Sequence, residues 1–377
     1  MKSRSRTSLL LAAALSGVLA LGLAAAGASA QALAPLSDRS SDRSSDREVR
    51  LDRSRLGTRA GGPAARMTTK ATSTPDRLVQ RVTLKWKGTW KDPDYDKQAV
   101  VPGIGTITLV CKPSSTMVRL YAADRDAETQ MWMAKYEVKN RHNVVAVKTA
   151  RIYRYAHAYD DGTGGTGSLA HEGLNQRTPI ENYSSGYLDG IISQRPGRNE
   201  PAGAAALEPV TSFRLNWYWN GFHHPRRYRS CQFDAVFKTT FPTRLGVSWH
   251  GEADAAGHTR QVTQLPSLGE LRLRCDTDDD GAGGIQSISL AANDPDARVY
   301  AETVTGEGFR EYHVDSVSLG YDPETGLVGP LPLPRNGMMR VYYTVGEVTR
   351  PFIVSSYYIT NNGNAALNLC ELAAAPY

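Results

Sequence analysis

The chain has 377 residues, with 44 Lys and Arg against 38 Asp and Glu, and its formal net charge is +6. Three of these basic residues lie within residues 1–30, so the remainder carries only +3, a balance that argues against nucleic-acid binding. After residue 30 no stretch is long and apolar enough to span a membrane.

Residues 1–30 have the pattern of a signal peptide. Lys2, Arg4 and Arg6 precede an apolar run over residues 9–26, and Ala-Ser-Ala at 28–30 is a small-x-small cleavage site. The alternative is an N-terminal membrane anchor, because the run approaches the length that spans a bilayer. We predict cleavage and a secreted, extracellular protein that has no membrane attachment afterwards.

Residues 31–77 predict a disordered arm. They contain no aromatic residue, and the motif Ser-Asp-Arg-Ser is reiterated between residues 37 and 47. Such a segment buries too little apolar surface to offset the entropy lost on ordering. It would serve either as a spacer or as a docking arm that orders on a partner.

From residue 78 the sequence predicts an all-β fold. Short runs rich in Val, Ile, Thr, Tyr and Trp are separated by Gly, Pro, Asn and Asp, which is typical of strands and turns. Clear examples are residues 82–86, 105–111, 213–217 and 339–345. One segment, Glu128 to Glu137, is predicted as a short helix.

A repeat divides this β region into two halves. The pattern W-x-G followed by P-x-x-G-x-(I/L)-x-L-x-C occurs twice, at Trp86, Gly88, Pro102, Gly105 and Cys111 and again at Trp249, Gly251, Pro266, Gly269 and Cys275. We therefore predict two tandem, homologous domains over residues 78–239 and 240–377. Many short strands with turns between them favour β-sandwich-like domains, although a barrel would show the same pattern.

Four cysteines, Cys111, Cys231, Cys275 and Cys370, occur in the chain, and in an exported protein they are expected to pair. Three connectivities are available to four cysteines. Because each half carries one early and one late cysteine, the repeat selects Cys111 with Cys231 and Cys275 with Cys370. Each bridge would close a loop of about 100 residues and contribute up to about 4–5 kcal/mol to stability.

An acidic turn follows Cys275 and resembles a calcium loop in spacing. Asp276, Asp278 and Asp280 occupy alternate positions before Gly281, which suits a loop of oxygen ligands around calcium. The twelfth position is Ser287, however, where such a loop needs a bidentate acid. The alternative is a plain acidic turn. No other cofactor is predicted.

An aromatic run, Trp217-Tyr218-Trp219, offers a candidate binding surface. Alternation places Trp217 and Trp219 on one face, where they would form a sugar-stacking platform or fill the core. The nearby pair His223-His224 predicts a turn, because adjacent strand residues point to opposite faces and seldom chelate one ion.

No nucleophile elbow, phosphate loop, dinucleotide fingerprint or zinc-binding helix motif is present. Three functions therefore stay open. The first is a non-catalytic interaction protein that bridges other secreted proteins. The second is a carbohydrate or cell-envelope binding protein. The third is a secreted hydrolase with its site in the long loops predicted at residues 160–167 and 195–209.

The overall layout resembles that of a known family. An Ala-, Arg- and Gly-rich leader, an arm over residues 37–59 and the duplicated Trp, Pro, Gly and Cys positions are similar to the adaptor subunit of the umbrella toxin particles of streptomycetes. The resemblance implies an actinobacterial secreted adaptor that joins a lectin-like subunit to a large toxin subunit. It also implies that the arm inserts into the lectin-like subunit.

Overall fold

In a computed structural model of the protein, residues 71–377 belong to one compact unit. The structure describes residues 77–139, 142–152, 165–174, 183–195, 203–204, 209–221, 224–240, 245–252, 257–277, 284–305, 314–360 and 363–377. The predicted signal peptide, the arm up to residue 76, and His223, Asp278 and Asp280 lie outside the described residues.

The described residues are nearly all β, as the strand-and-turn texture predicts. Those before residue 241 form β1 (Arg77–Lys87), β2 (Asp96–Val101), β3 (Gly105–Lys112), β4 (Ser115–Ala122), β5 (Glu128–Lys139), β6 (His142–Ile152), β7 (Tyr183–Arg195), β8 (Gly203–Ala204), β9 (Val210–Asn220), η1 (Arg226–Tyr228) and β10 (Ser230–Thr240). Those after it form β11 (Gly246–His250), β12 (Arg260–Leu265), β13 (Gly269–Thr277), β14 (Gly284–Ala292), β15 (Arg298–Thr305), β16 (Val314–Asp322), β17 (Leu327–Pro332), β18 (Asn336–Val345), β19 (Val348–Ile359), η2 (Ala365–Leu367) and β20 (Leu369–Pro376).

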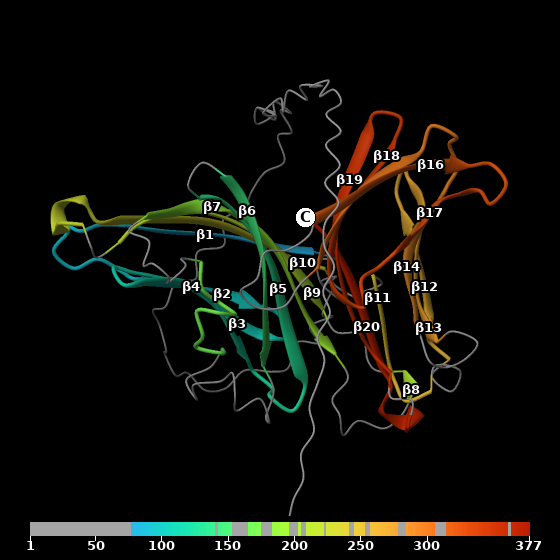
Figure 1. The fold of residues 1–377 in the computed structure, drawn as a ribbon, viewed down its shortest axis with the longest axis horizontal. Helices are drawn as coiled ribbons and strands as arrows, with labels where there is room; N and C mark the ends of the chain where they lie inside the picture. Colours follow the sequence, from blue (N-terminus) through green and yellow to red (C-terminus); the bar gives the residue numbers. More distant parts are fainter. Residues whose placement is uncertain are drawn as a thin grey trace, which may run out of the picture. The chain divides into compact units, whose positions relative to one another are not determined.

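The two halves share one strand order. In the first half one sheet runs β1-β10-β9-β7-β5-β6 and a second runs β2-β3-β4. The second half contains the equivalent series β11-β20-β19-β18-β15-β16 and β12-β13-β14. There, however, β17 pairs with both β14 and β16, so the two layers join into one continuous sheet (Figure 1).

Strand pairing crosses the boundary between the two halves. The short strand β8 belongs to the first half by sequence, yet it pairs with β11 of the second half, where Ala204 lies opposite Trp249. Residues from both sides of position 240 thus share one sheet within one compact unit. The division into two domains at this position stays a prediction.

Each half encloses an apolar core between its layers. Trp86, Leu109 and Phe233 are fully or almost fully buried in the first core, and Trp249 and Val341 in the second. Successive side chains of a strand point to opposite faces of the sheet, so every second side chain enters the apolar core between the layers.

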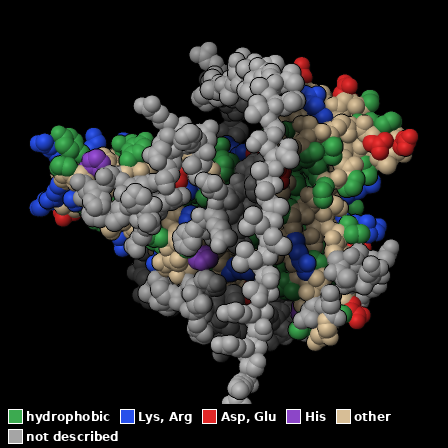
Figure 2. All heavy atoms as spheres, in the orientation of Figure 1, with side chains coloured by type: hydrophobic (Ala, Val, Ile, Leu, Met, Phe, Trp, Pro, Cys, Tyr) green, Lys and Arg blue, Asp and Glu red, His purple; other side chains and the backbone are tan. Residues whose placement is uncertain are grey.

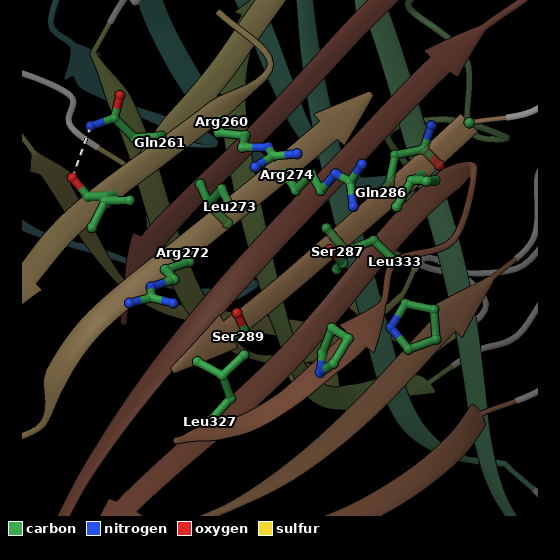
Figure 3. Close-up of a pocket in the computed structure, with 15 residues that line it drawn as sticks. Arg260, Gln261, Arg272, Leu273, Arg274, Gln286, Ser287, Ser289, Leu327 and Leu333 are labelled. Carbon is green, nitrogen blue, oxygen red and sulfur yellow. Dashed lines mark hydrogen bonds between the residues drawn. The ribbon is translucent and has the colours of Figure 1, made fainter. Parts of the chain in front are cut away.

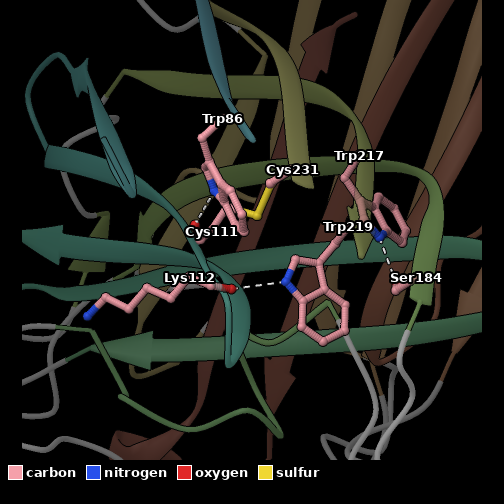
Figure 4. Close-up of a disulfide and its surroundings, with 7 residues drawn as sticks. All are labelled: Trp86, Cys111, Lys112, Ser184, Trp217, Trp219 and Cys231. Atoms are coloured by element: carbon pink, nitrogen blue, oxygen red, sulfur yellow. Dashed lines mark hydrogen bonds between the residues drawn. A yellow bond between two sulfur atoms is a disulfide. The ribbon is translucent and has the colours of Figure 1, made fainter. Parts of the chain in front are cut away.

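The cysteines pair as the repeat predicts, Cys111 with Cys231 and Cys275 with Cys370, and each pair has a Cα–Cα distance of 6.5 Å. Beside each bridge a tryptophan indole nitrogen donates to a cysteine carbonyl oxygen. Trp86 Nε1 lies 2.7 Å from the Cys111 oxygen (Figure 4), and Trp249 Nε1 lies 3.0 Å from the Cys275 oxygen. This bond explains why tryptophan and cysteine recur together. Two disulfides indicate an oxidising, extracellular type of environment.

The repeated glycine of P-x-x-G has a backbone that other residues rarely adopt. Gly105 has a φ of 156° and Gly269 a φ of 123°. A Cβ atom would lie 1.9 Å from the Tyr121 carbonyl oxygen at the first position and 2.1 Å from the Ala291 oxygen at the second. The motif therefore marks a place where two strands approach too closely for any side chain.

The helix predicted over Glu128 to Glu137 is wrong, because these residues lie in β5. Consecutive side chains from Glu128 to Lys135 are all buried, so the strand shows no alternation of polar and apolar residues. Both of its faces are covered, since Met131 and Met133 join the core of the first half while Trp132 contacts the second half.

A third apolar cluster joins the halves; its residues come from β5, β6, β7 and β9 of the first half and from β15, β18, β19 and β20 of the second. It comprises Trp132, Ala134, Val147, Ile191 and Val210 from the first half and Val304, Met338, Ile353, Ala373 and Ala375 from the second. Sheets that pack face to face in this way bury a continuous apolar layer.

Polar side chains lie beside this cluster. Asp189 is fully buried and accepts from Arg340 Nη1 at 2.9 Å and from Arg214 Nε at 3.0 Å, while Arg340 also pairs with Glu302. Elsewhere in the interface, the Arg195 guanidinium lies 3.8 Å from the ring centroid of Tyr357. The interface between the halves is therefore well packed and specifically paired in charge.

Candidate functional site

The two tryptophans of the predicted sugar platform are core residues. Trp217 is 3% exposed and Trp219 is fully buried. Their indole nitrogens donate to Ser184 Oγ and to the Lys112 carbonyl oxygen, both at 2.9 Å (Figure 4). A ring enclosed in this way cannot stack on a sugar, so the platform interpretation of these two residues is wrong and the core-filling alternative holds.

Of the predicted calcium ligands, only Asp276 is described. Its Oδ2 accepts from Arg274 Nη2 at 3.2 Å and lies 4.0 Å from Arg260 Nη2, so arginines already surround its charge. Among the described residues no group of three or more His, Cys, Asp or Glu side chains could hold a metal ion. Calcium binding stays a prediction. His224 lies in a turn, where its amide donates to the Gly221 carbonyl.

A groove of about 640 Å³ crosses the strands β12, β13 and β14 beside Asp276. Its far wall comes from β17 and the residues just after it, including Pro330, Pro332 and Leu333. We call it the arginine groove, because three arginines line it: Arg260, Arg272 and Arg274. Figure 3 shows Arg260 and Arg274 side by side on neighbouring strands.

The strand register sets like charges against one another in this groove. Arg260 lies directly opposite Arg274 in the β12–β13 pair, and Arg272 lies opposite Val262. Like charges at opposite positions destabilise a sheet. Two acids offset part of this cost, since Glu270 Oε2 lies 3.0 Å from Arg272 and Asp276 bonds Arg274. The described lining residues themselves carry three positive charges and no negative charge.

Two donors in the groove wall lack a hydrogen-bond partner. Arg274 Nε and Gln286 Nε2 are both shielded from solvent, and neither finds an acceptor among the described residues. Gln286 as a whole is only 7% exposed. Because buried donors are nearly always satisfied in folded proteins, these two can take an acceptor from water or from a bound partner.

Apolar surface accompanies the charge. Val262 is 50% exposed and Ile285 is 37% exposed, and both line the groove with Pro330 and Pro332. The strand β12 also lies at the edge of its sheet. Edges of this kind accept extended segments of other chains, with pockets that read alternate side chains. The groove therefore suits an extended ligand with both acidic and apolar groups.

The equivalent surface of the first half lacks this charge. Counting from the shared Pro and Cys of the repeat, the counterparts of Arg260, Arg272 and Arg274 are Asp96, Thr108 and Val110. The arginine groove is thus a property of the second half alone, built on a strand layout that both halves share.

The lining favours binding over catalysis. Within the described part of the chain it contains no His, Cys, Asp or Glu that could act as a base or a charged nucleophile, whereas its arginines can each hold a carboxylate through two parallel hydrogen bonds. The alternation of Arg272 and Arg274 along one strand is visible in the sequence. Its pairing with Arg260 is not, because it depends on the β12–β13 register.

Comparison with family models, with curated proteins and with solved structures finds no match to this chain. In the part of the chain that the structure describes, no helix has both the length and the apolar character needed to cross a membrane.

Proposed function

We propose that the protein is a secreted, non-catalytic adaptor that bridges other secreted proteins, and that the arginine groove binds an acidic, extended segment of one partner. The observation that carries this proposal is the set of three arginines and two unpartnered donors that line one groove. A partner segment with alternating acidic and apolar side chains would supply both the missing acceptors and the missing apolar cover.

The divergence of the two halves supports a bridging role. A duplicated scaffold that carries the groove on one half only has two different surfaces to offer to two different partners. The predicted signal peptide and the two disulfides support secretion. If the resemblance in layout extends to function, the two partners would be a lectin-like subunit and a large toxin subunit of a toxin particle.

Binding of a labelled peptide of alternating Glu and Val to the full-length protein tests the groove. In fluorescence anisotropy we expect micromolar binding that weakens with salt, because the contacts are between charges. The double variant Arg272→Ala/Arg274→Ala should bind at least about tenfold more weakly, which corresponds to about 1.4 kcal/mol.

The matched control is Arg298→Ala/Arg350→Ala, which removes the same charge from two exposed arginines of the second half that do not line the groove. It should bind the peptide as the wild type does, and a Gln-Val peptide should not bind. If both double variants lose the same affinity for the peptide, net charge alone explains the binding and the proposal is contradicted. Native protein that elutes from culture fluid strictly as a monomer with no co-eluting partner would also contradict it.

A further inference from the structure

A second surface of different chemistry lies on the first half. The outer face of the β7, β9, β10 and β1 strands carries three exposed tyrosines, Tyr183, Tyr187 and Tyr218, which are 49%, 40% and 42% exposed. In the register of the sheet, Tyr187 lies opposite Asn216, and Tyr218 lies opposite Gln232. We call these five side chains the tyrosine face.

The tyrosine rings are held in fixed orientations. Tyr187 stacks on Tyr136 with ring centroids 4.7 Å apart and an interplanar angle of 9°, and the Arg340 guanidinium lies 4.5 Å from the Tyr136 centroid. Tyr183 packs edge-on against Tyr218 at 5.4 Å. Rings that are already ordered lose little entropy when a ligand stacks on them.

In the second half, the tyrosine at the position equivalent to Tyr218 is covered by the other half. Tyr357 is the counterpart of Tyr218, because each lies opposite the residue that follows the late cysteine of its half, Glu371 and Gln232. Tyr357 is only 6% exposed, since Arg195 covers its ring in the interface between the halves. That face is used within the molecule, whereas the tyrosine face is open.

The composition of the open face suits a sugar chain. Neighbouring strands lie about 5 Å apart and successive outward residues about 7 Å apart, so outward side chains on this face are spaced on the scale of single sugar rings. The C–H groups of a pyranose carry partial positive charge and pack against the negative face of an aromatic ring. The amide of Asn216 offers a donor and an acceptor to sugar hydroxyls, and Gln232, whose Nε2 already donates to Asp234, offers its carbonyl oxygen.

Basic side chains lie beside the tyrosines, and one acid lies among them: Asp234, opposite Asn216, accepts from Gln232 Nε2 at 2.7 Å and from Thr83 Oγ1 at 3.0 Å. Lys85 lies on the same rung of the sheet as Gln232 and Tyr218, and Lys87 follows on the same face. Beyond them, basic and acidic side chains lie together where the β1–β2 and β9–β10 connections meet, at the left in Figure 2; by sequence they include Lys91, Arg226 and Arg227 and the acids Asp92 and Asp94. The lysines of β1 are therefore the charges that would pair with an anionic ligand on this face.

We propose that the tyrosine face binds an acidic polysaccharide, a chain of pyranose rings that bear carboxylate groups. The rings would stack on the tyrosines and the carboxylates would pair with the lysines of β1. A polyol phosphate chain lacks the flat ring faces that this surface accommodates. Single-stranded nucleic acid is the other polyanion that stacks on aromatic side chains, and the test separates the two.

The test measures binding of the full-length protein to oligogalacturonate, to its methyl ester and to a single-stranded DNA oligonucleotide by isothermal titration calorimetry. We expect binding to the free acid, at least about tenfold weaker binding to the uncharged ester, and a loss of affinity in Tyr218→Ala and in Lys85→Ala/Lys87→Ala of about tenfold each.

The matched control is Tyr300→Ala, which removes a tyrosine of nearly equal exposure, 41%, from the other half. It should bind as the wild type does, and so should the groove variant Arg272→Ala/Arg274→Ala. Circular dichroism of each variant confirms the fold, and Tyr183→Ala is a second probe of the same face. The proposal is overturned if the acid and its ester bind equally, if Tyr218→Ala and Tyr183→Ala both bind normally, or if DNA binds more tightly than the glycan.

Discussion

The recurring residues of the two halves recur for physical reasons that act one residue at a time. Gly105 and Gly269 each lie where a side chain would collide with a neighbouring carbonyl, and Trp86 and Trp249 each donate to a cysteine carbonyl. A buried indole N–H is costly without its acceptor, so the tryptophan and the backbone that accepts its hydrogen bond are constrained together. These positions are the ones that sequence comparison of the two halves identifies, because each half must satisfy the same local demand.

At the residue scale we predict that Gly269→Ala lowers the free energy of unfolding by about 2–3 kcal/mol, since the new Cβ would overlap the Ala291 oxygen in a backbone with positive φ. Urea unfolding followed by tryptophan fluorescence measures it. Gly320→Ala is the control, because no atom lies within 4 Å of the Cβ added there, and its effect should stay within about 0.5 kcal/mol. Equal effects in both variants would refute the steric explanation.

At the scale of elements, a buried lysine fixes a loop of the first half to its sheet. Lys148 on β6 donates to the carbonyl oxygens of Leu169 and Ala170, both at 2.9 Å. The same segment adds to the edge of β4, where the Leu174 amide bonds the Thr116 oxygen at 2.9 Å. In the second half β17 occupies the corresponding edge of β14, so each half covers this edge in its own way.

We predict that Lys148→Met, which keeps the length of the side chain and removes the donor, loosens this segment. The amide of Leu174 should exchange its hydrogen at least about tenfold faster, while amides in the centre of β9 keep their protection. Hydrogen exchange followed by NMR measures both. Lys238→Met, which removes a lysine on β10, should leave Leu174 unchanged. If Leu174 exchanges at the wild-type rate in Lys148→Met, the two bonds do not hold the loop.

The strands themselves were predictable where one face is solvated. Residues 82–86 and 213–217 alternate as expected and lie in β1 and β9. β5 was not predictable, because its second face is covered by the other half and the alternation disappears. The arginine groove is intermediate: two of its arginines alternate along one strand, but the third joins them only through strand register.

At the scale of the whole molecule, the interface between the halves could not be read from the sequence. Asp189 and Arg340 are 151 residues apart and no local pattern connects them. Breaking such a buried pair leaves an uncompensated charge, which commonly costs about 3–5 kcal/mol. The same interface contains a second buried acid, Glu371, which is influenced by Ser193 and Arg195 of the first half.

This acid gives the interface a dependence on pH. Burial raises the pKa of Glu371 to about 7, against the opposing effects of Ser193 and Arg195, from an ordinary value of 4.5. The folded protein therefore holds a proton that the unfolded chain releases between about pH 4.5 and 7. The resulting stabilisation is fully present below pH 4.5 and is lost as the pH rises through 7.

We predict that Glu371→Gln, which stays neutral, flattens the decline in unfolding free energy between pH 5 and pH 7 (about the window set by the two pKa values) relative to the wild type. Urea unfolding at intervals across this range measures it. Burial also raises the pKa of Glu172 to about 7, so part of the decline will persist. Glu347→Gln, at an exposed position, is the control. Parallel curves for Glu371→Gln and the wild type would contradict the prediction.

The pairing of β8 with β11 has a consequence for the order in which the chain matures. Residues 203–204 are synthesised before residues 246–250, the strand with which they pair. Until the second half folds, we expect the first half to lack both the strand that pairs with β8 and the bond from Arg340 to Asp189. A fragment that starts at residue 240 would lack β8, and a fragment that ends there would lack β11.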